Sequence, residues 1–209
     1  EPGPPAGARS PASPGSAASA SPRARAASRR LRAVIFDFDA TLTAREELQV
    51  WRLFPERGGF RRDIDVGWLR EKGFGGEGRV ECLGCMLSAL AAAGAELHIL
   101  SFADREVIVR ALAILGALHF FCDRIVGWQE LQAHGHGGGG QAKGLFIKDL
   151  MHARSWTKDQ VLFVDDQDGN VRAARGLCLT HRVRGVGLSP EEMDEVVDQA
   201  TAAAADGGP

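Results

Sequence analysis

Residues 34–43 read Val-Ile-Phe-Asp-Phe-Asp-Ala-Thr-Leu-Thr, a run of strand-forming apolar residues that ends in two aspartates, Asp37 and Asp39, one residue apart. Side chains alternate between the two faces of a strand, so both carboxylates are expected on the same side, where they repel each other. Like charges this close together need something that holds them in place. The stretch therefore predicts a buried strand that ends at a charged site.

The rest of the chain alternates between short apolar runs and helical patterns. Strands are expected over 32–36, 96–100, 124–126 and 161–164, with a further element over 177–183. Helices are expected over 79–93, 104–115, 143–154 and from 190 to about 202. This order predicts an α/β fold, a three-layer, doubly wound (Rossmann-like) parallel sheet with helices on both faces.

Glycine, serine and proline mark several helix ends. Gly94 and Gly116 stand where two of the helices should stop. Ser189 and Pro190, followed by Glu192, form the N-cap, first-position proline and capping-box acid of the last helix.

Polar residues follow three of the predicted strands. Asp37 and Asp39 come after the first strand, Ser101 after strand 96–100, and Asp165 with Asp166 after strand 161–164. In a parallel sheet these carboxyl ends meet at one edge, where ligands bind. Carboxylate oxygens without histidine or cysteine suit Mg²⁺, which proteins hold with one or two carboxylates, water and phosphate oxygens.

In this arrangement the chain resembles the haloacid dehalogenase superfamily of phosphotransferases over about residues 32–185. The first motif of that family, D-x-D-x-T, corresponds to residues 37–41, and its second, a hydroxyl at a strand end, to Ser101. The paired acids of its last motif correspond to Asp165 and Asp166, followed by Asn170. Ala40 stands where many members have glycine.

The third motif of the family is a lysine before the acidic strand, and this chain offers Lys143 and Lys148. Lys143 stands at the expected start of a helix, where the helix dipole favours anions, and we predict that it is the site lysine. Lys148 is then a surface residue.

The resemblance implies a Mg²⁺-dependent phosphatase that works through an aspartyl-phosphate. Asp37 would be the nucleophile and Asp39 the acid and base, while dehalogenating members lack the second aspartate. The implied metal ligands are Asp37, Asp39, Asp165 and Asp166. The residues implied to bind phosphate are Thr41, Ser101 and Lys143, and Asn170 supports the site.

Between the first motif and residue 79 lies an insert of about 35 residues, too short for a large cap domain. The chain in this respect looks most like the capless magnesium-dependent phosphatases, whose open site would admit a sugar phosphate or a phosphoprotein. The insert contains basic and aromatic residues, namely Arg52, Arg57, Arg61, Arg62 and Arg70, with Trp51 and Trp68. The arginines could bind a second anionic group of the substrate, or they could form an ordinary solvated surface.

The first 30 residues consist mainly of Ala, Ser, Pro, Gly and Arg, which predicts a disordered tail or an organelle transit peptide. Residues 31–203 would form the phosphatase domain, with its small insert at about 44–79, and 204–209 a flexible end. A net charge of −2 favours neither nucleic acid nor a membrane surface as partner, and four cysteines in 209 residues suggest an intracellular setting, cytoplasmic or organellar. The sequence makes no prediction of oligomeric state.

Two other functions remain open: a catalytically idle binding or regulatory module on the same fold, and a receiver-like phosphorylation domain, in which the acidic pair comes early.

Three smaller features, two pairs of residues and one histidine, are assigned structural roles. Cys82 and Cys85 are predicted as helix core residues rather than half of a zinc site or a redox pair. His134 and His136 are assigned to a glycine-rich loop rather than to a metal, and His98 to the core.

Overall fold

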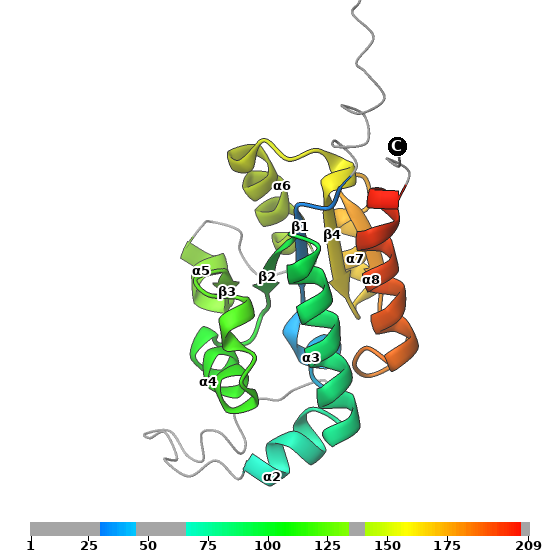
Figure 1. Cartoon of the computed structure of the whole chain (residues 1–209). Helices are drawn as coiled ribbons and strands as arrows, with labels where there is room; N and C mark the ends of the chain where they lie inside the picture. Colours follow the sequence, from blue (N-terminus) through cyan, green and yellow to red (C-terminus); the bar gives the residue numbers. More distant parts are fainter. Residues whose placement is uncertain (1–29, 45–65, 134–140, 206–209) are drawn as a thin grey trace, which may run out of the picture.

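The computed structural model describes residues 30–44, 66–133 and 141–205. Its centre is a five-stranded parallel sheet with the strand order β3-β2-β1-β4-β5 (Figure 1). The strands are β1 (Ala33–Phe36), β2 (Glu96–Leu100), β3 (Ile125–Val126), β4 (Val161–Asp165) and β5 (Leu179–Arg182). Strands β2 and β3 lie on one side of β1, and β4 and β5 lie on its other side. The direction in which successive strands are added therefore reverses between β1 and β4.

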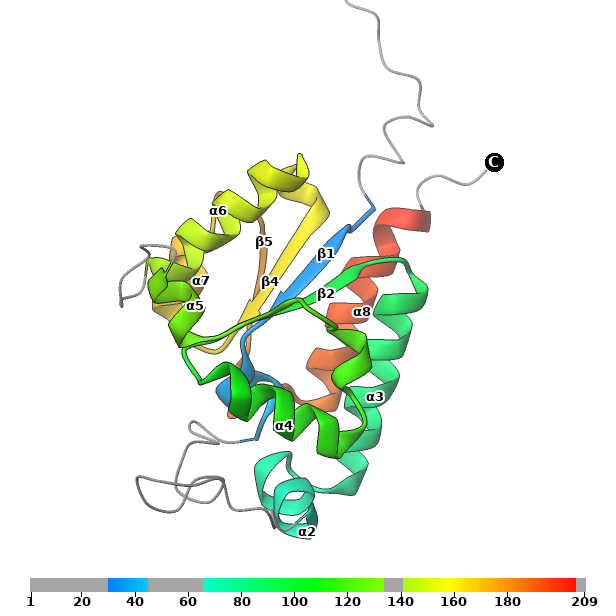
Figure 2. The same ribbon diagram turned by 90° about the vertical axis from the view of Figure 1, so that its left-hand side faces the viewer.

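Helices cover both faces of the sheet (Figure 2). One face carries α3 (Glu77–Ala92), α4 (Arg105–Leu115) and α8 (Pro190–Ala205), whose apolar residues share one core cluster. The other face carries α5 (Trp128–Ala133), α6 (Ala142–Arg154) and α7 (Asp168–Ala174). The three-layer, doubly wound fold predicted from the sequence is confirmed.

The central strand, β1, contributes alternate residues to the two hydrophobic cores. Val34 and Phe36 belong to the core under α3, α4 and α8, whereas Ala33 and Ile35 belong to the core under α5 and α6. All four residues are buried, as a parallel strand covered on both faces requires. By the same alternation Asp37, the next residue, points to the α6 side.

The predicted helix ends are present. Gly94 and Gly116 follow α3 and α4 with φ of +82° and +75°, the left-handed conformation that glycine adopts without a steric penalty. At the start of α8 the Ser189 Oγ accepts a hydrogen bond from the Glu192 amide (3.2 Å), while the Glu192 carboxylate accepts one from the Ser189 amide (3.0 Å). This reciprocal pair is a capping box.

Several short elements were not predicted. They are α5, α7, the turn η1 (Phe38–Leu42), α2 (Val66–Trp68), η2 (Leu69–Gly73), η3 (Leu118–Phe120) and η4 (Lys158–Gln160). Elements α2 and η2 show that the end of the insert is helical, next to the start of α3 (Figure 1). Residues 45–65, and with them most of the predicted insert, lie outside the described residues, as do 1–29, 134–140 and 206–209.

The prediction that both cysteines of α3 are core residues was wrong for Cys85, which is exposed, and Cys82 is only half-buried. The buried face of α3 consists of Leu83, Met86, Leu87 and Leu90. Because successive residues turn by about 100°, Cys85 falls on the opposite side of the helix from Leu83. His98, by contrast, is buried as predicted.

Among the described helices, none combines the length and the hydropathy needed to cross a bilayer.

Candidate functional site

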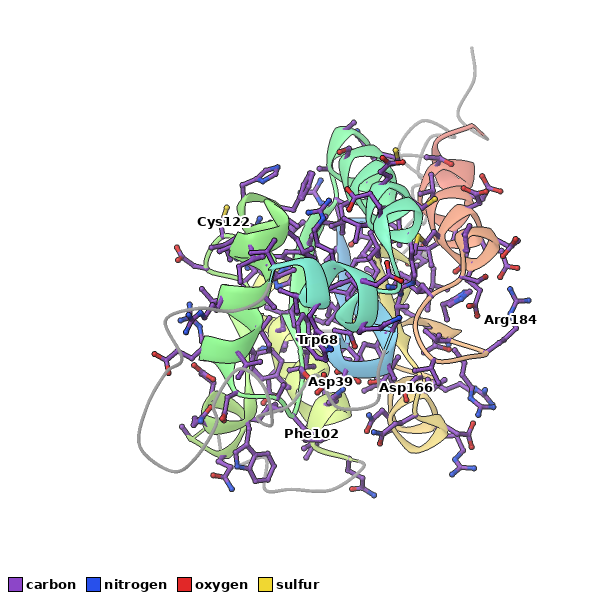
Figure 3. All side chains as sticks on the ribbon, turned by 90° about the horizontal axis from the view of Figure 1, so that it is seen from below. Asp39, Trp68, Phe102, Cys122, Asp166 and Arg184 are labelled. Atoms are coloured by element: carbon purple, nitrogen blue, oxygen red, sulfur yellow. The ribbon has the colours of Figure 1, made fainter. Side chains whose placement is uncertain are left out.

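The carboxyl ends of β1, β2 and β4 point to the same end of the molecule, the end near α2 (Figure 1). Asp37 follows β1, Ser101 follows β2, and Asp165 closes β4, with Asp166 next to it. Figure 3 looks toward this end of the molecule and labels Asp39 and Asp166 on it. The sheet thus brings together residues that are more than a hundred positions apart in the chain.

Lys143 lies between two of these acids. Its side chain is fully buried, and its Nζ lies 2.9 Å from Asp37 Oδ1 and 2.8 Å from Asp165 Oδ2. Lys143 reaches them because it stands in the first turn of α6, the helix that packs on the side of the sheet to which Asp37 points. The choice of Lys143 over Lys148 agrees with this geometry, since Lys148 is exposed.

Burial alone would lower the pKa of Lys143, but the carboxylates of Asp37 and Asp165 raise it above its ordinary value. The lysine therefore stays protonated at neutral pH. It is the positive charge that the adjacent acids require, and it is built into the fold.

Asp165 is held by a set of donors. Its Oδ1 accepts from the Gln167 amide (2.7 Å), and both of its oxygens lie 3.1 Å from the Asn170 Nδ2. Burial raises the pKa of Asp165, while the Lys143 ammonium opposes that shift. These contacts fix the carboxylate in one orientation, and Asn170 takes part in two of them.

Asp37, Asp165 and Asp166 can each offer an oxygen within 4.8 Å of the others, and they are the group of acids, among the described residues, that is spaced to hold a metal ion. An all-carboxylate set suits Mg²⁺ or a similar hard cation. Asp39, which the sequence placed among the metal ligands, does not belong to this group. The donor set fits the implied metal with three of the four proposed ligands.

Asp39 lies in η1, the turn that follows β1. Asp39 itself is extended (φ −67°, ψ 138°), and Ala40 is left-handed (φ 52°). The Ala40 amide donates to the Thr43 Oγ1 (3.0 Å), which ties the turn together. Asp39 is half-buried, whereas Asp37 is only 4% exposed, so the two acids of the pair have different environments.

The two predicted hydroxyl residues are buried at the same end of the sheet. Ser101 Oγ accepts a hydrogen bond from the Ala103 amide (3.1 Å), which leaves its own hydrogen available as a donor. Thr41 is fully buried, and its Oγ1 has no hydrogen-bond partner among the described residues.

Phe102 is a site residue that the sequence interpretation missed. Its ring lies 5.1 Å from the Lys143 Nζ, and it meets Trp128 edge to face at 5.8 Å. The ring helps to cover the ammonium and favours its charged form. The available signal was its position directly after Ser101, since a residue next to a strand-end motif lies near the site.

The predicted basic residues of the insert are only partly described. Arg70 forms an ion pair with Glu77 at the start of α3, and Trp68 packs against the edge of the core. Arg52, Arg57, Arg61, Arg62 and Trp51, together with His134 and His136, lie outside the described residues. Their suggested roles stay predictions.

No protein-family model matches the chain, and no curated protein does. Solved structures match it at low identity. A cobalt-bound deoxy-D-mannose-octulosonate 8-phosphate phosphatase (YrbI) from Haemophilus influenzae has 17% identity and a TM-score of 0.51, over 86% of this chain and 92% of that one. A probable YrbI family phosphatase from Pseudomonas syringae has 14% identity and a TM-score of 0.50, over 88% and 92%.

A hypothetical protein from Xanthomonas campestris also matches, with 20% identity and a TM-score of 0.50, over 94% of each chain. At these identities the likenesses show the fold. The chain therefore has the same α/β fold as these three proteins, and the fold implied by the resemblance to the haloacid dehalogenase superfamily is confirmed.

Proposed function

We propose that this protein is a Mg²⁺-dependent phosphatase that hydrolyses phosphomonoesters through an aspartyl-phosphate on Asp37. The observation that carries the proposal is the buried bridge from Asp37 through Lys143 to Asp165, next to Asp166, at the carboxyl end of the central strands. A structural ion pair does not need three acids and a lysine at the position where α/β sheets bind ligands.

Asp37 is suited to be the nucleophile because two donors hold its carboxylate. Its Oδ1 accepts from the Lys143 ammonium and from the Phe38 amide (2.7 Å). With Oδ1 fixed, the second oxygen would attack phosphorus, forming the Asp37–phosphorus bond as the bond to the ester oxygen breaks.

Asp39 would complete both half-reactions. In the first, it gives a proton to the departing ester oxygen. In the second, it takes a proton from the water that attacks phosphorus, which releases phosphate and restores the Asp37 carboxylate. Its half-buried place in η1 suits a group that must exchange protons with substrate and water.

Three further residues would meet the negative charge on the phosphoryl oxygens. Lys143 carries a fixed positive charge, and Ser101 has a hydroxyl hydrogen to donate; the buried Thr41 lies in the same turn as Asp39. Asp37, Asp165 and Asp166 would hold Mg²⁺, which when bound neutralises charge on the phosphoryl group.

For the substrate we propose a sugar phosphate, with a phosphoprotein as the second possibility. The Haemophilus influenzae protein that shares the fold is a phosphatase of a sugar-acid 8-phosphate. A comparison of phosphorylated sugars with phosphopeptides distinguishes the two, because the preferred class will have the higher kcat/KM.

The activity itself is tested with p-nitrophenyl phosphate and Mg²⁺, using wild-type protein, Asp37→Asn and Asp198→Asn. Asp198 is an exposed acid of α8 and serves as the matched control. We expect phosphate release that falls by about a thousand-fold or more in Asp37→Asn, remains in Asp198→Asn, and is lost with a chelator. Activity that survives Asp37→Asn would refute the mechanism, and a wild type inactive on this and on sugar phosphates would favour the idle binding module.

A further inference from the structure

Arg79 joins three separate segments of the chain through backbone carbonyls. It lies in the first turn of α3, and its guanidinium donates to Leu42 O, Phe74 O and Leu188 O at 2.9 Å each, and to Thr41 O at 3.2 Å. Two of these carbonyls belong to η1, the turn that carries Asp39. The others belong to the end of the insert and to the segment before α8.

The backbone around Arg79 leaves room for this side chain by using glycine. Gly187 has φ +85°, and a Cβ there would lie 2.6 Å from an Arg79 guanidinium nitrogen and 2.4 Å from the Thr43 carbonyl oxygen. Gly75 has φ +82°, and a Cβ there would come within 3.0 Å of the Arg79 Cδ. A side chain at either position would therefore collide with the Arg79 side chain in its present place.

Turn η1 depends on these outside contacts. Its Ala40 carbonyl accepts from the Gly187 amide (2.7 Å), and its Thr41 carbonyl accepts from the Leu188 amide (2.9 Å) as well as from Arg79. A non-glycine residue in the left-handed region, as Ala40 is, persists only where the surroundings hold it. Arg79 and the 187–188 segment belong to those surroundings, together with the Thr43 Oγ1 that accepts from the Ala40 amide.

The charge of Arg79 suits this task. Burial lowers the pKa of Arg79 to about 10, so the group still carries its charge at neutral pH. A planar guanidinium presents several donors in fixed directions, whereas a lysine ammonium cannot reach four carbonyls from one position.

We propose that Arg79 is a positioning residue: by fixing η1 it places Asp39 for proton transfer to the leaving group. This inference rests on the proposed phosphatase function. It predicts a defect that depends on the leaving group, because a nitrophenolate departs with little help from an acid, whereas an alkoxide needs the proton.

The test compares Arg79→Met with wild type on p-nitrophenyl phosphate and on glycerol phosphate in the presence of Mg²⁺. We expect kcat/KM for glycerol phosphate to fall at least about tenfold more than kcat/KM for p-nitrophenyl phosphate, since general acid catalysis contributes about 10²- to 10⁴-fold and kcat/KM excludes the later hydrolysis of the aspartyl-phosphate, which both substrates share. Arg124→Met is the matched control. Arg124 also donates to two carbonyls, Leu97 O and Phe120 O, but away from η1, so its variant should keep the wild-type ratio.

An equal loss on both substrates in Arg79→Met would overturn the inference and leave Arg79 a purely structural residue. If Arg79→Met does not fold, Arg79→Lys is measured in the same way. This variant keeps the positive charge but loses the planar set of guanidinium donors, and we expect the same change in the ratio between the two substrates. A wild type without turnover of these two substrates and of sugar phosphates would refute the proposed function and the inference with it. An active wild type with an unchanged ratio in the variants would refute the inference alone.

Discussion

At the scale of single residues, a substitution of Ala40 can measure the backbone strain in the turn of the first motif. Its φ of 52° costs an alanine about 1–2 kcal/mol, which Ala40→Gly would recover. The change also removes a buried methyl group, worth about 0.8 kcal/mol, and makes the unfolded chain more flexible, worth about 0.4–1 kcal/mol. We therefore expect the free energy of unfolding, measured in urea, to change by less than about 1 kcal/mol.

The control for that measurement is Ala111→Gly. Ala111 is equally buried but lies inside the regular helix α4, where glycine costs about 1 kcal/mol in helix propensity and about 0.8 kcal/mol in lost burial. It should destabilise the protein by about 2 kcal/mol. Equal losses in the two variants would mean that Ala40 is not strained.

Lys143 carries a second prediction at this scale. Lys143→Met leaves the Asp37 and Asp165 carboxylates facing each other in a buried place without their counter-charge, which should cost about 3–5 kcal/mol. A divalent ion among Asp37, Asp165 and Asp166 would replace part of that charge. We expect Mg²⁺ to raise the thermal unfolding temperature of Lys143→Met more than that of the wild type.

Lys148→Met, on the exposed side of the same helix, should respond to Mg²⁺ as the wild type does. If Mg²⁺ stabilises neither protein, the three acids do not form a metal site. If it stabilises both equally, Lys143 and the ion do not share the same acids.

At the scale of elements, the start of α8 gives a quantitative test of a cap that the sequence predicted. Ser189→Ala removes the acceptor for the Glu192 amide, and should lower the free energy of unfolding by about 1 kcal/mol. Thr201→Ala, at an exposed position of the same helix, removes a hydroxyl that bonds only to the preceding turn, and should be neutral or slightly stabilising. Both values come from urea denaturation, and a neutral Ser189→Ala would contradict the cap.

The elements that the sequence predicted are those with strong local signals. Strand β2 has the predicted bounds, α4 and α6 each differ by one residue at their start, and α3 differs by two residues at its start and one at its end. The missed helices α5 and α7 are six and seven residues long, too short for a helical period to show. Cys85 was misplaced for a related reason, because an apolar helix without clear amphipathicity does not show which side is buried.

At the scale of the whole molecule, the strand ends could be predicted and the contacts between them could not. Parallel strands must deliver their last residues to one edge, so Asp37, Ser101 and Asp165 could be placed together from the sequence. That Lys143 would bridge two acids, and that Asp39 would stand apart from the three-acid group, depended on side-chain directions in the folded chain. The Arg79 contact with Leu188, 109 residues away, has no local sequence signal.

The opposite end of the sheet makes the stability of the whole molecule depend on pH. His98 of β2 is 7% exposed and packs edge to face on Trp156, with centroids 6.0 Å apart. The ionisable groups near it are Glu96, 3.4 Å from its Nε2, and Arg124 and Arg154. Burial lowers the pKa of His98 from 6.5 to about 4, although the Glu96 carboxylate acts to raise it.

A histidine whose pKa is lower in the folded state is protonated first in the unfolded state. The neutral His98 therefore makes its full contribution to the free energy of unfolding above pH 6.5. As the pH falls from 6.5 to about 4, this residue lowers the free energy of unfolding by about 3 kcal/mol. His98→Gln cannot take up that proton. Between pH 7 and pH 4 its free energy of unfolding should fall by about 3 kcal/mol less than that of the wild type. His152→Gln, at an exposed position of α6, should follow the wild type, and parallel curves for all three proteins would show that His98 does not govern acid unfolding.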